Sequence, residues 1–198
     1  MVTPEQIALA ETATAAAMTT IRPALPAIWR ALDQVPDPEI PVVSVVELGI
    51  VRSVEWDAAD PASLVVRVTP TYSGCPATDL INAGIRDALV ALGVPRVRLE
   101  TQLAPAWTTD WIAAEARAKL RAYGIAPPMA RGLAAAHRAS ASVDVTGISP
   151  FRRTSVVVPC PRCGSVQTRL LAQFGSTACK AQYRCDECLE PFDYFKPH

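Results

Sequence analysis

Two pairs of cysteines near the C-terminus have the spacing of a metal site. Cys160 and Cys163 are separated by two residues, as are Cys185 and Cys188, and 21 residues lie between the pairs. Each Cys-x-x-Cys pair can form a tight turn, so that four thiolates converge on one tetrahedral ion. The pattern predicts a closed, structural Zn²⁺ site. Iron, an iron-sulfur cluster and disulfides are the alternatives, because rubredoxin-like sites use the same four ligands.

The residues around these pairs, 155–198, form a unit that cannot bury much apolar surface by itself. A bound metal would therefore supply a large part of its folding free energy. We expect strands within 166–174 and 181–183 to hold the two turns. Gly164 follows the first pair and lets the backbone turn back, whereas Leu189, which follows the second pair, suits that position less well.

Cys75 is a lone cysteine placed where a reactive thiol would be useful. It precedes Pro76, which suits the first position of a helix, so we expect its sulfur at the N-cap of a helix over 76–92. Unpaired amides and the helix dipole at that place favour a thiolate and lower its pKa. Such a thiolate can bind a soft metal transiently. The alternative is a cysteine packed beneath its loop.

Four further residues are candidates for the same chemistry. Cys179 falls outside both cysteine pairs and is either a small buried residue or a second thiol that contacts a transferred metal. Asp37 and Glu39 either cap a turn in a proline-bounded loop or supply carboxylates near Cys75. Glu47, a little further along the chain, is a candidate for the same reason.

Hydrophobic periodicity predicts an α+β fold. Apolar residues alternate with polar ones where strands are expected and recur at helical spacing elsewhere. The expected helices are around 28–32, 76–92 and 111–123, and the expected strands are 50–56, 64–69 and 97–103. These elements predict a small two-layer domain with a three-stranded mixed sheet and helices, followed by the four-cysteine zinc ribbon.

Composition divides the chain into four parts. We predict a loosely ordered, alanine-rich arm (1–24), the α+β domain (25–124), a linker with one weak helix around 130–137 (125–154) and the zinc ribbon (155–198). The two histidines fall in the linker and at the last residue, where we expect them to be solvated.

Charge and hydropathy argue against several classes of protein. Lys and Arg total 19, as do Asp and Glu, so the formal net charge is zero and bulk electrostatic binding of nucleic acid is not expected. A membrane span is not expected either, because the chain lacks a run of about 18 apolar residues. The N-terminus lacks the basic region of a secretory signal, so we expect a cytoplasmic protein whose cysteines are ligands or reactive thiols.

Catalysis by Cys75 is also disfavoured. The sequence around it offers no histidine, and the α+β part has no Cys-x-x-Cys motif. The usual partners of a nucleophilic or redox-active cysteine are therefore missing. We expect a protein that is not itself an enzyme.

Three segments of the first domain resemble the SufT-like iron-sulfur assembly domain family. They are Asp37-Pro38-Glu39-Ile40-Pro41, Glu47-Leu48-Gly49-Ile50-Val51 and Thr71-Tyr72-Ser73-Gly74-Cys75-Pro76. Three more segments lie in the C-terminal unit: Cys160-Pro161-Arg162-Cys163, Phe174–Lys180 and Cys185–Phe195. With these added, the chain from Pro26 to Lys196 resembles the PaaD family of the phenylacetyl-CoA epoxidase system.

This resemblance implies an accessory role in aerobic phenylacetate degradation. The protein would help to assemble an iron-sulfur cluster, or iron, in a component of the epoxidase, above all its iron-sulfur reductase. Asp37 and Cys75 would be the functional acid and thiol, with Thr71 shaping their loop. Zn²⁺ would be structural, and iron or a cluster would be bound only in transit. The alternatives are a non-catalytic structural subunit of the oxygenase complex and, for assembly state, a homodimer.

Overall fold

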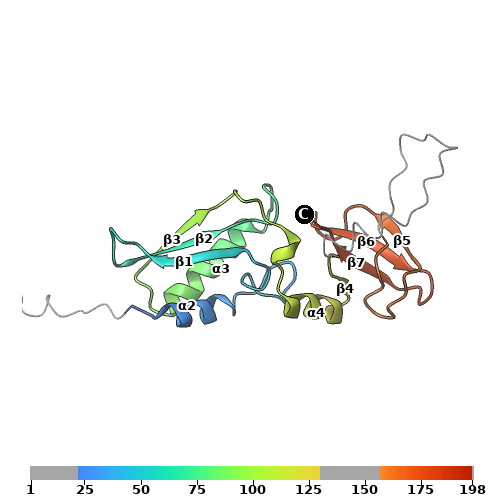
Figure 1. The fold of residues 1–198 in the computed structure, drawn as a ribbon, viewed down its shortest axis with the longest axis horizontal. Coiled ribbons are helices and arrows are strands. Elements are labelled where there is room, and N and C mark those ends of the chain that lie inside the picture. The colour runs from blue at the N-terminus through green and yellow to red at the C-terminus, as the bar shows by residue number, and fades with distance from the viewer. Residues whose placement is uncertain (1–21, 130–156, 198) are drawn as a thin grey trace, which may run out of the picture.

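The computed structural model describes residues 22–129 and 157–197. Within these ranges an α+β domain and a smaller β-ribbon are arranged end to end (Figure 1). The α+β class, the three-stranded mixed sheet and the C-terminal four-cysteine unit are as predicted. The expectations for the arm up to residue 21, for the weak helix at 130–137 and for both histidines lie outside the described residues.

The sheet of the first domain combines a hairpin with a crossover. It contains β1 (Val51–Trp56), β2 (Ser63–Val68) and β3 (Arg96–Thr101). Strand β2 lies in the centre, antiparallel to β1 and parallel to β3. A parallel pair needs a long connection, and a helix between β2 and β3 supplies it. The mixed sheet therefore follows from the order of elements along the chain.

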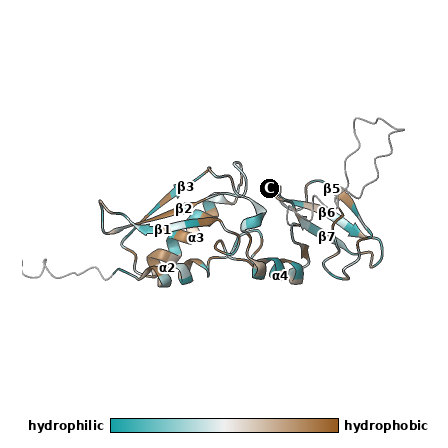
Figure 2. Cartoon of the chain, in the orientation of Figure 1, coloured by the Kyte–Doolittle hydropathy of each residue, from teal (hydrophilic) through white to brown (hydrophobic). Residues whose placement is uncertain are grey.

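Two helices cover one face of this sheet (Figure 1). They are α2 (Leu25–Leu32) and α3 (Thr78–Ala91). Ile81, Ile85 and Leu89 recur every four residues and form the buried face of α3. They pack on the apolar side chains of β2, the strand whose residues are mostly apolar in Figure 2. The core of the first domain lies between these two layers.

The helix predicted over 111–123 is divided in two. A short 3-10 helix, η1 (Thr109–Trp111), is followed by extended Ile112 and then by α4 (Ala114–Tyr123). The division has a packing cause, because Ile112 is buried and the next amide, that of Ala113, donates to the Glu47 carbonyl. Gly49 allows this close approach, since a Cβ there would lie 2.8 Å from the Trp111 Cβ. Helix α4 ends at Gly124, because this residue has a left-handed backbone conformation that cannot continue the helix.

The ribbon contains four strands rather than the two regions predicted. They are β4 (Ile125–Ala126), β5 (Thr168–Ala172), β6 (Lys180–Cys185) and β7 (Pro191–Phe195), in the order β4-β7-β6-β5. The two residues of β4 fall in the segment expected to begin the linker, yet they pair in parallel with β7. The chain therefore enters the ribbon sheet directly after α4. Periodicity could not reveal a strand of two residues.

Phe195, the last residue of β7, joins the two parts. Its side chain is 1% exposed and packs in the hydrophobic core of the first domain rather than in that of the ribbon. Its ring lies 6.1 Å from the ring of Trp107, whose Nε1 donates to the Leu48 carbonyl at 2.9 Å. The ribbon is thus held against the first domain by a buried aromatic contact.

In the described part of the chain, no helix is both long enough and apolar enough to cross a bilayer.

Replacement of Phe195 by Ala tests this contact. Loss of a fully buried phenylalanine should lower the free energy of unfolding by about 3–5 kcal/mol. Phe174→Ala is the control, because that ring is 65% exposed, and it should change stability by less than about 0.5 kcal/mol. Denaturant unfolding of both variants measures the difference. Equal losses would contradict the proposed importance of Phe195.

Candidate functional site

The four paired cysteines converge in the ribbon. Their sulfur atoms all lie within 4.8 Å of one another. Sγ of Cys160 lies 3.7 Å from Sγ of Cys188, and Sγ of Cys163 lies 3.6 Å from Sγ of Cys185. A tetrahedral ion with metal-sulfur bonds of about 2.3 Å requires sulfur atoms about 3.8 Å apart. Disulfides are excluded here, because their sulfur atoms would be about 2.0 Å apart.

Backbone turns of similar form present each pair. The Gly164 amide donates to the Cys160 carbonyl at 2.9 Å, and Gly164 has a φ of +77°. Leu189 occupies the matching place after the second pair with a φ of +63°. A left-handed conformation is unfavourable for leucine by about 1–2 kcal/mol. The second turn therefore forms even though leucine is unfavourable at position 189. Such a conformation is expected where convergence of four cysteine ligands constrains the backbone.

The electrostatics of the four sulfurs call for a cation. The amides of Cys188 and Glu187 donate toward Cys185 and lower the pKa of that thiol to about 7. The Ser165 amide acts in the same direction on Cys163, but desolvation and the other three sulfurs raise the pKa of Cys163 to about 12. Four thiolates cannot share this space without a compensating charge, and a divalent ion supplies it. The donor set fits a structural zinc ion, held by all four cysteines, which would crosslink the two turns.

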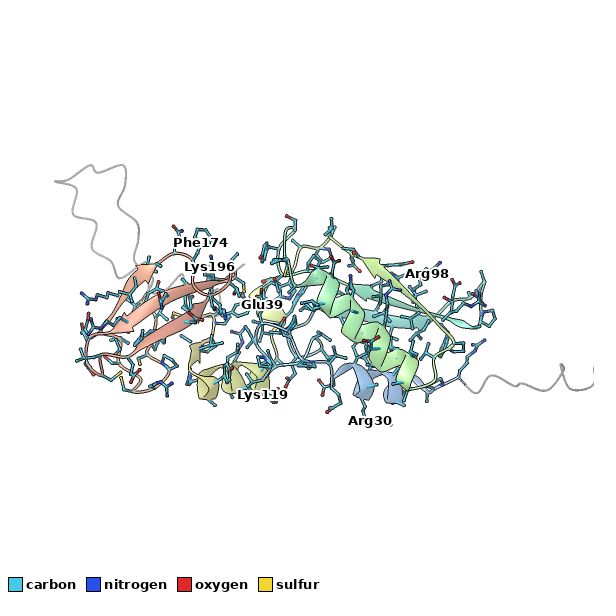
Figure 3. All side chains as sticks on the ribbon, turned by 180° about the vertical axis from the view of Figure 1, so that it is seen from behind. Arg30, Glu39, Arg98, Lys119, Phe174 and Lys196 are labelled. Atoms are coloured by element: carbon cyan, nitrogen blue, oxygen red, sulfur yellow. The ribbon has the colours of Figure 1, made fainter. Side chains whose placement is uncertain are left out.

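A second group of candidate residues lines a pocket where the ribbon meets the first domain. Asp37, Glu39, Thr71 and Cys75 come from the first domain, and Cys179 comes from the ribbon. All five are residues that the sequence singled out for handling iron or a cluster. The remaining walls are mostly apolar: Ile40, Leu48, Ile50, Val68, Ile81 and Phe195 are among them. Figure 3 shows Glu39 at this junction, with Lys196 and Phe174 of the ribbon on the neighbouring side.

Asp37 both shapes its loop and faces the pocket. Its Oδ1 accepts hydrogen bonds from the amides of Glu39 at 2.9 Å and Ile40 at 2.8 Å. The side chain is buried, and burial raises the pKa of Asp37 more than these two bonds lower it. Asp37 can therefore cap its turn and still present a carboxyl group to the pocket.

Cys179 lies against Glu39 across the boundary between the two parts. Its Sγ donates toward Glu39 Oε2 at 3.7 Å and lies 3.0 Å from Thr177 Oγ1. The Cys179 carbonyl accepts from the Lys196 amide, which extends the pairing of β6 with β7 and fixes the cysteine beside Phe195. Burial raises the pKa of Cys179, so its thiol is protonated until something replaces the proton.

Cys75 is not at the helix N-cap as predicted. Helix α3 begins at Thr78 with Ala77 at its N-cap, so Cys75 precedes the cap by two residues. Pro76 and Ala77 form a turn instead, because the fixed φ of proline suits a turn as well as a first helical position. Thr78 Oγ1 donates to the Cys75 carbonyl at 2.8 Å and holds the loop to the helix. The half-buried thiol lines the pocket from this loop.

Glu47 lies in a different network. Its carboxylate accepts from the Ser44 amide at 3.0 Å and pairs with Lys119 of α4 at 2.7 Å. It fastens the loop before β1 to α4 and is not among the residues that line the pocket. Asp37 and Glu39, by contrast, do line the pocket.

Two residues of the pocket, and one residue near it, were not among the candidates predicted from the sequence. Tyr72 lies near the thiols: burial raises the pKa of its phenol, and the charges of Cys75, Cys179 and Glu39 raise it further. Asn82 lines the pocket from α3, and Phe195 does so from β7. Tyr72 and Phe195 belong to the motifs quoted above, whereas no pattern in the sequence marks Asn82.

Comparisons with known proteins cover both parts of the chain. Residues 25–99 match the family described as iron-sulfur cluster assembly protein, and residues 149–196 match the family described as PaaD zinc beta ribbon domain. A protein of Escherichia coli (strain K12), named provisionally as one of the subunits of 1,2-phenylacetyl-CoA epoxidase, is 47% identical over 178 residues. That match covers 90% of this chain and 96% of the Escherichia coli protein.

Three solved structures are similar to part of this chain. A conserved hypothetical protein from Thermotoga maritima is 28% identical, covers 52% of this chain and 98% of its own, and has a TM-score of 0.43. A domain of unknown function from Bacillus anthracis is 26% identical, covers 48% of this chain and 89% of its own, and has the same TM-score. A Mycobacterium tuberculosis protein, described as associated with Fe-S complex assembly and repair, is 34% identical with a TM-score of 0.33. It covers 54% of this chain and 93% of its own.

Replacement of Cys185 by Ser tests the metal centre. The purified protein should contain one zinc ion per chain, and Cys185→Ser should lose it, because three thiolates leave the site open. Since the metal stabilises the ribbon, the variant should also lose near-ultraviolet dichroism from Tyr183 and Tyr194. Cys75→Ser, outside the paired cysteines, is the matched control and should keep its zinc. Full zinc content in Cys185→Ser would contradict the assignment of this ligand.

Replacement of Asp37 by Asn separates its two roles. The raised pKa means that the contribution of Asp37 to stability is greatest below about pH 3.9 and is lost as pH rises through the folded-state pKa. Asparagine still accepts both amide hydrogen bonds without a buried charge. Asp37→Asn should therefore unfold at the same or a higher temperature than the wild type at pH 7, with the advantage shrinking toward pH 4.

Asp37→Ala is the comparison for this test. It removes both hydrogen bonds and should cost about 1–3 kcal/mol at either pH, because two buried amides lose their acceptor. Thermal unfolding at the two pH values measures both variants. Similar destabilisation by Asn and Ala at pH 7 would contradict the buried-charge argument.

Proposed function

Because the chain belongs to the PaaD family of phenylacetyl-CoA epoxidase proteins, we propose that it is a maturation factor for that enzyme system. In this proposal it assists assembly of iron, or of an iron-sulfur cluster, in a component of the epoxidase. The protein is not itself catalytic, acts in the cytoplasm and binds neither nucleic acid nor membranes. Its main client is the iron-sulfur reductase component.

One observation carries the proposal. The pocket brings two thiols and two carboxylates, from Cys75, Cys179, Asp37 and Glu39, to one apolar junction between the two parts. Sulfur and carboxylate oxygen together suit divalent iron, which accepts both kinds of ligand. The similarity of residues 25–99 to an iron-sulfur assembly family supports the same chemistry.

The four-cysteine site and the pocket lie in different places and offer different sets of ligands. Four thiolates enclose the structural ion completely, so that site has no free position for exchange. The pocket offers fewer donors and is lined mainly by apolar side chains, so that an ion bound there is held weakly enough to leave. Thr71 lies beside Cys75 in the loop that borders the pocket. We propose that this loop is the path by which cargo is passed to the client.

A second function, that of a non-catalytic member of the oxygenase complex, is favoured by the name of the Escherichia coli relative, which describes part of an epoxidase. Such a protein would stay in the complex in fixed proportion. Size-exclusion chromatography of the co-expressed epoxidase components separates the two functions, because a maturation factor leaves the mature complex. The same column, run with the free chain, tests whether it forms the expected homodimer.

Serine substitutions of the two pocket thiols test the proposed function. When Cys75→Ser or Cys179→Ser replaces the wild type in cells that make the reductase, iron and sulfide in the purified reductase should fall to the level found without this protein. Serine is nearly the same size but a poor ligand for iron, so zinc content and unfolding temperature should change little. Ser73→Ala, exposed in the same loop, is the control and should leave the reductase fully loaded.

Full iron and sulfide in the reductase made with Cys75→Ser would overturn the role of that thiol. Stable association of the wild type with the mature complex in fixed proportion would favour the non-catalytic structural role instead.

A further inference from the structure

The pocket is small. The volume open to the centre of a water molecule is about 20 Å³, which is room for one or two atoms of that size. Even the smallest common cluster contains two iron and two sulfide ions. A cluster is therefore larger than this space, whereas a single ion is not.

The donors in the pocket do not form a complete coordination shell. Among the described His, Cys, Asp and Glu residues, only the four paired cysteines form a group of three or more that could hold a metal ion. In the pocket, Cys179 Sγ and Glu39 Oε2 form a pair 3.7 Å apart. Two tetrahedral ligands with bonds of about 2.3 and 2.1 Å lie about 3.6 Å apart. The pair therefore fits one ion, and other ligands must fill its remaining positions.

Asn82 supplies the second observation. Its Oδ1 is buried, has no hydrogen-bond partner among the described residues, and belongs to a side chain that lines the pocket. Thr78, one turn earlier on α3, does not satisfy it, because its hydroxyl donates to the Cys75 carbonyl. A buried acceptor left unpaired is unfavourable. Its presence in this pocket indicates a ligand that carries an O–H or N–H donor.

We infer that the pocket takes a single ferrous ion that retains bound water, rather than a preformed iron-sulfur cluster. Cys179 and Glu39 are its first protein ligands, Cys75 is available from the opposite loop, and Asn82 accepts a hydrogen bond from the water on the ion. This inference rests on the proposed function and specifies its cargo. Each thiol that binds the ion releases one proton to solvent, and no electron is transferred.

Anaerobic titration of the full-length, zinc-loaded protein tests the inference. Ferrous iron alone should bind at one ion per chain in addition to zinc, and a glutathione-ligated [2Fe–2S] complex should transfer no sulfide to the protein. Asn82→Leu should weaken ferrous binding at least about tenfold, as expected for the loss of a hydrogen bond to a charged centre. The same variant should unfold at a higher temperature than the wild type without iron, because it removes the unpaired acceptor.

Two further variants serve as controls for Asn82→Leu. Asn82→Asp retains an acceptor oxygen and should bind ferrous iron at least as tightly as the wild type. Leu80→Ala changes a residue that is 64% exposed on the same helix, and it should alter neither binding nor unfolding temperature.

The outcomes distinguish this inference from the proposed function. If Asn82→Leu binds ferrous iron as tightly as the wild type, or if the wild type takes up iron and sulfide together, the single-ion inference is overturned. The proposed function still stands in either case, provided that the Cys75 and Cys179 variants leave the reductase without its cluster. If the wild type binds neither ferrous iron nor a cluster, and those variants load the reductase fully, both are overturned.

Discussion

The packing of Phe195 into the first domain is the contact on which the rest of the structure depends. Strand β7 carries this side chain, and pairing of β7 with β6 fixes Cys179 beside it. Cys179 therefore reaches Glu39 only when the ribbon is folded and docked. Because a metal held by the four thiolates would stabilise the ribbon, it would also support the pocket, which lies outside the metal centre. The two parts act as one unit although their sequence motifs are separate.

Sulfur serves two purposes in this chain, and the surroundings of each atom determine which. In the ribbon, four sulfurs lie within 4.8 Å of one another, and amide hydrogen bonds to Cys185 lower the pKa of that thiol. In the pocket, the Cys179 thiol is buried near Glu39 and Asp37, and burial together with these carboxylates raises its pKa. A metal must displace a proton to bind there, so binding is weaker and reversible. In the proposed function, the same element thus provides a permanent crosslink in one place and a transient ligand in the other.

The sequence predicted the features that local patterns encode. Spacing identified the four cysteines that converge in the ribbon, alternation identified β1 to β3, and glycine identified the end of α4. It could not predict the two-residue strand β4, since two residues have no periodicity, or the start of α3, since proline suits a turn as well as a helix. The meeting of Cys179 with Asp37, Glu39 and Cys75 depends on docking of the ribbon. The quoted motifs named these residues, but only the fold brings them together.

Two groups in the pocket are unfavourable for the stability of the empty protein. Asp37 carries a carboxyl group that burial disfavours as an anion, and Asn82 presents an acceptor without a donor. Groups of this kind are retained where a ligand satisfies them, because natural proteins lose stability at functional sites and regain it elsewhere. A cation carrying water satisfies both at once: its charge favours the Asp37 anion, and its water donates to Asn82. The buried Asp37 carboxyl and the unpaired Asn82 acceptor therefore indicate the same ligand, a hydrated cation. Neither residue would identify it alone.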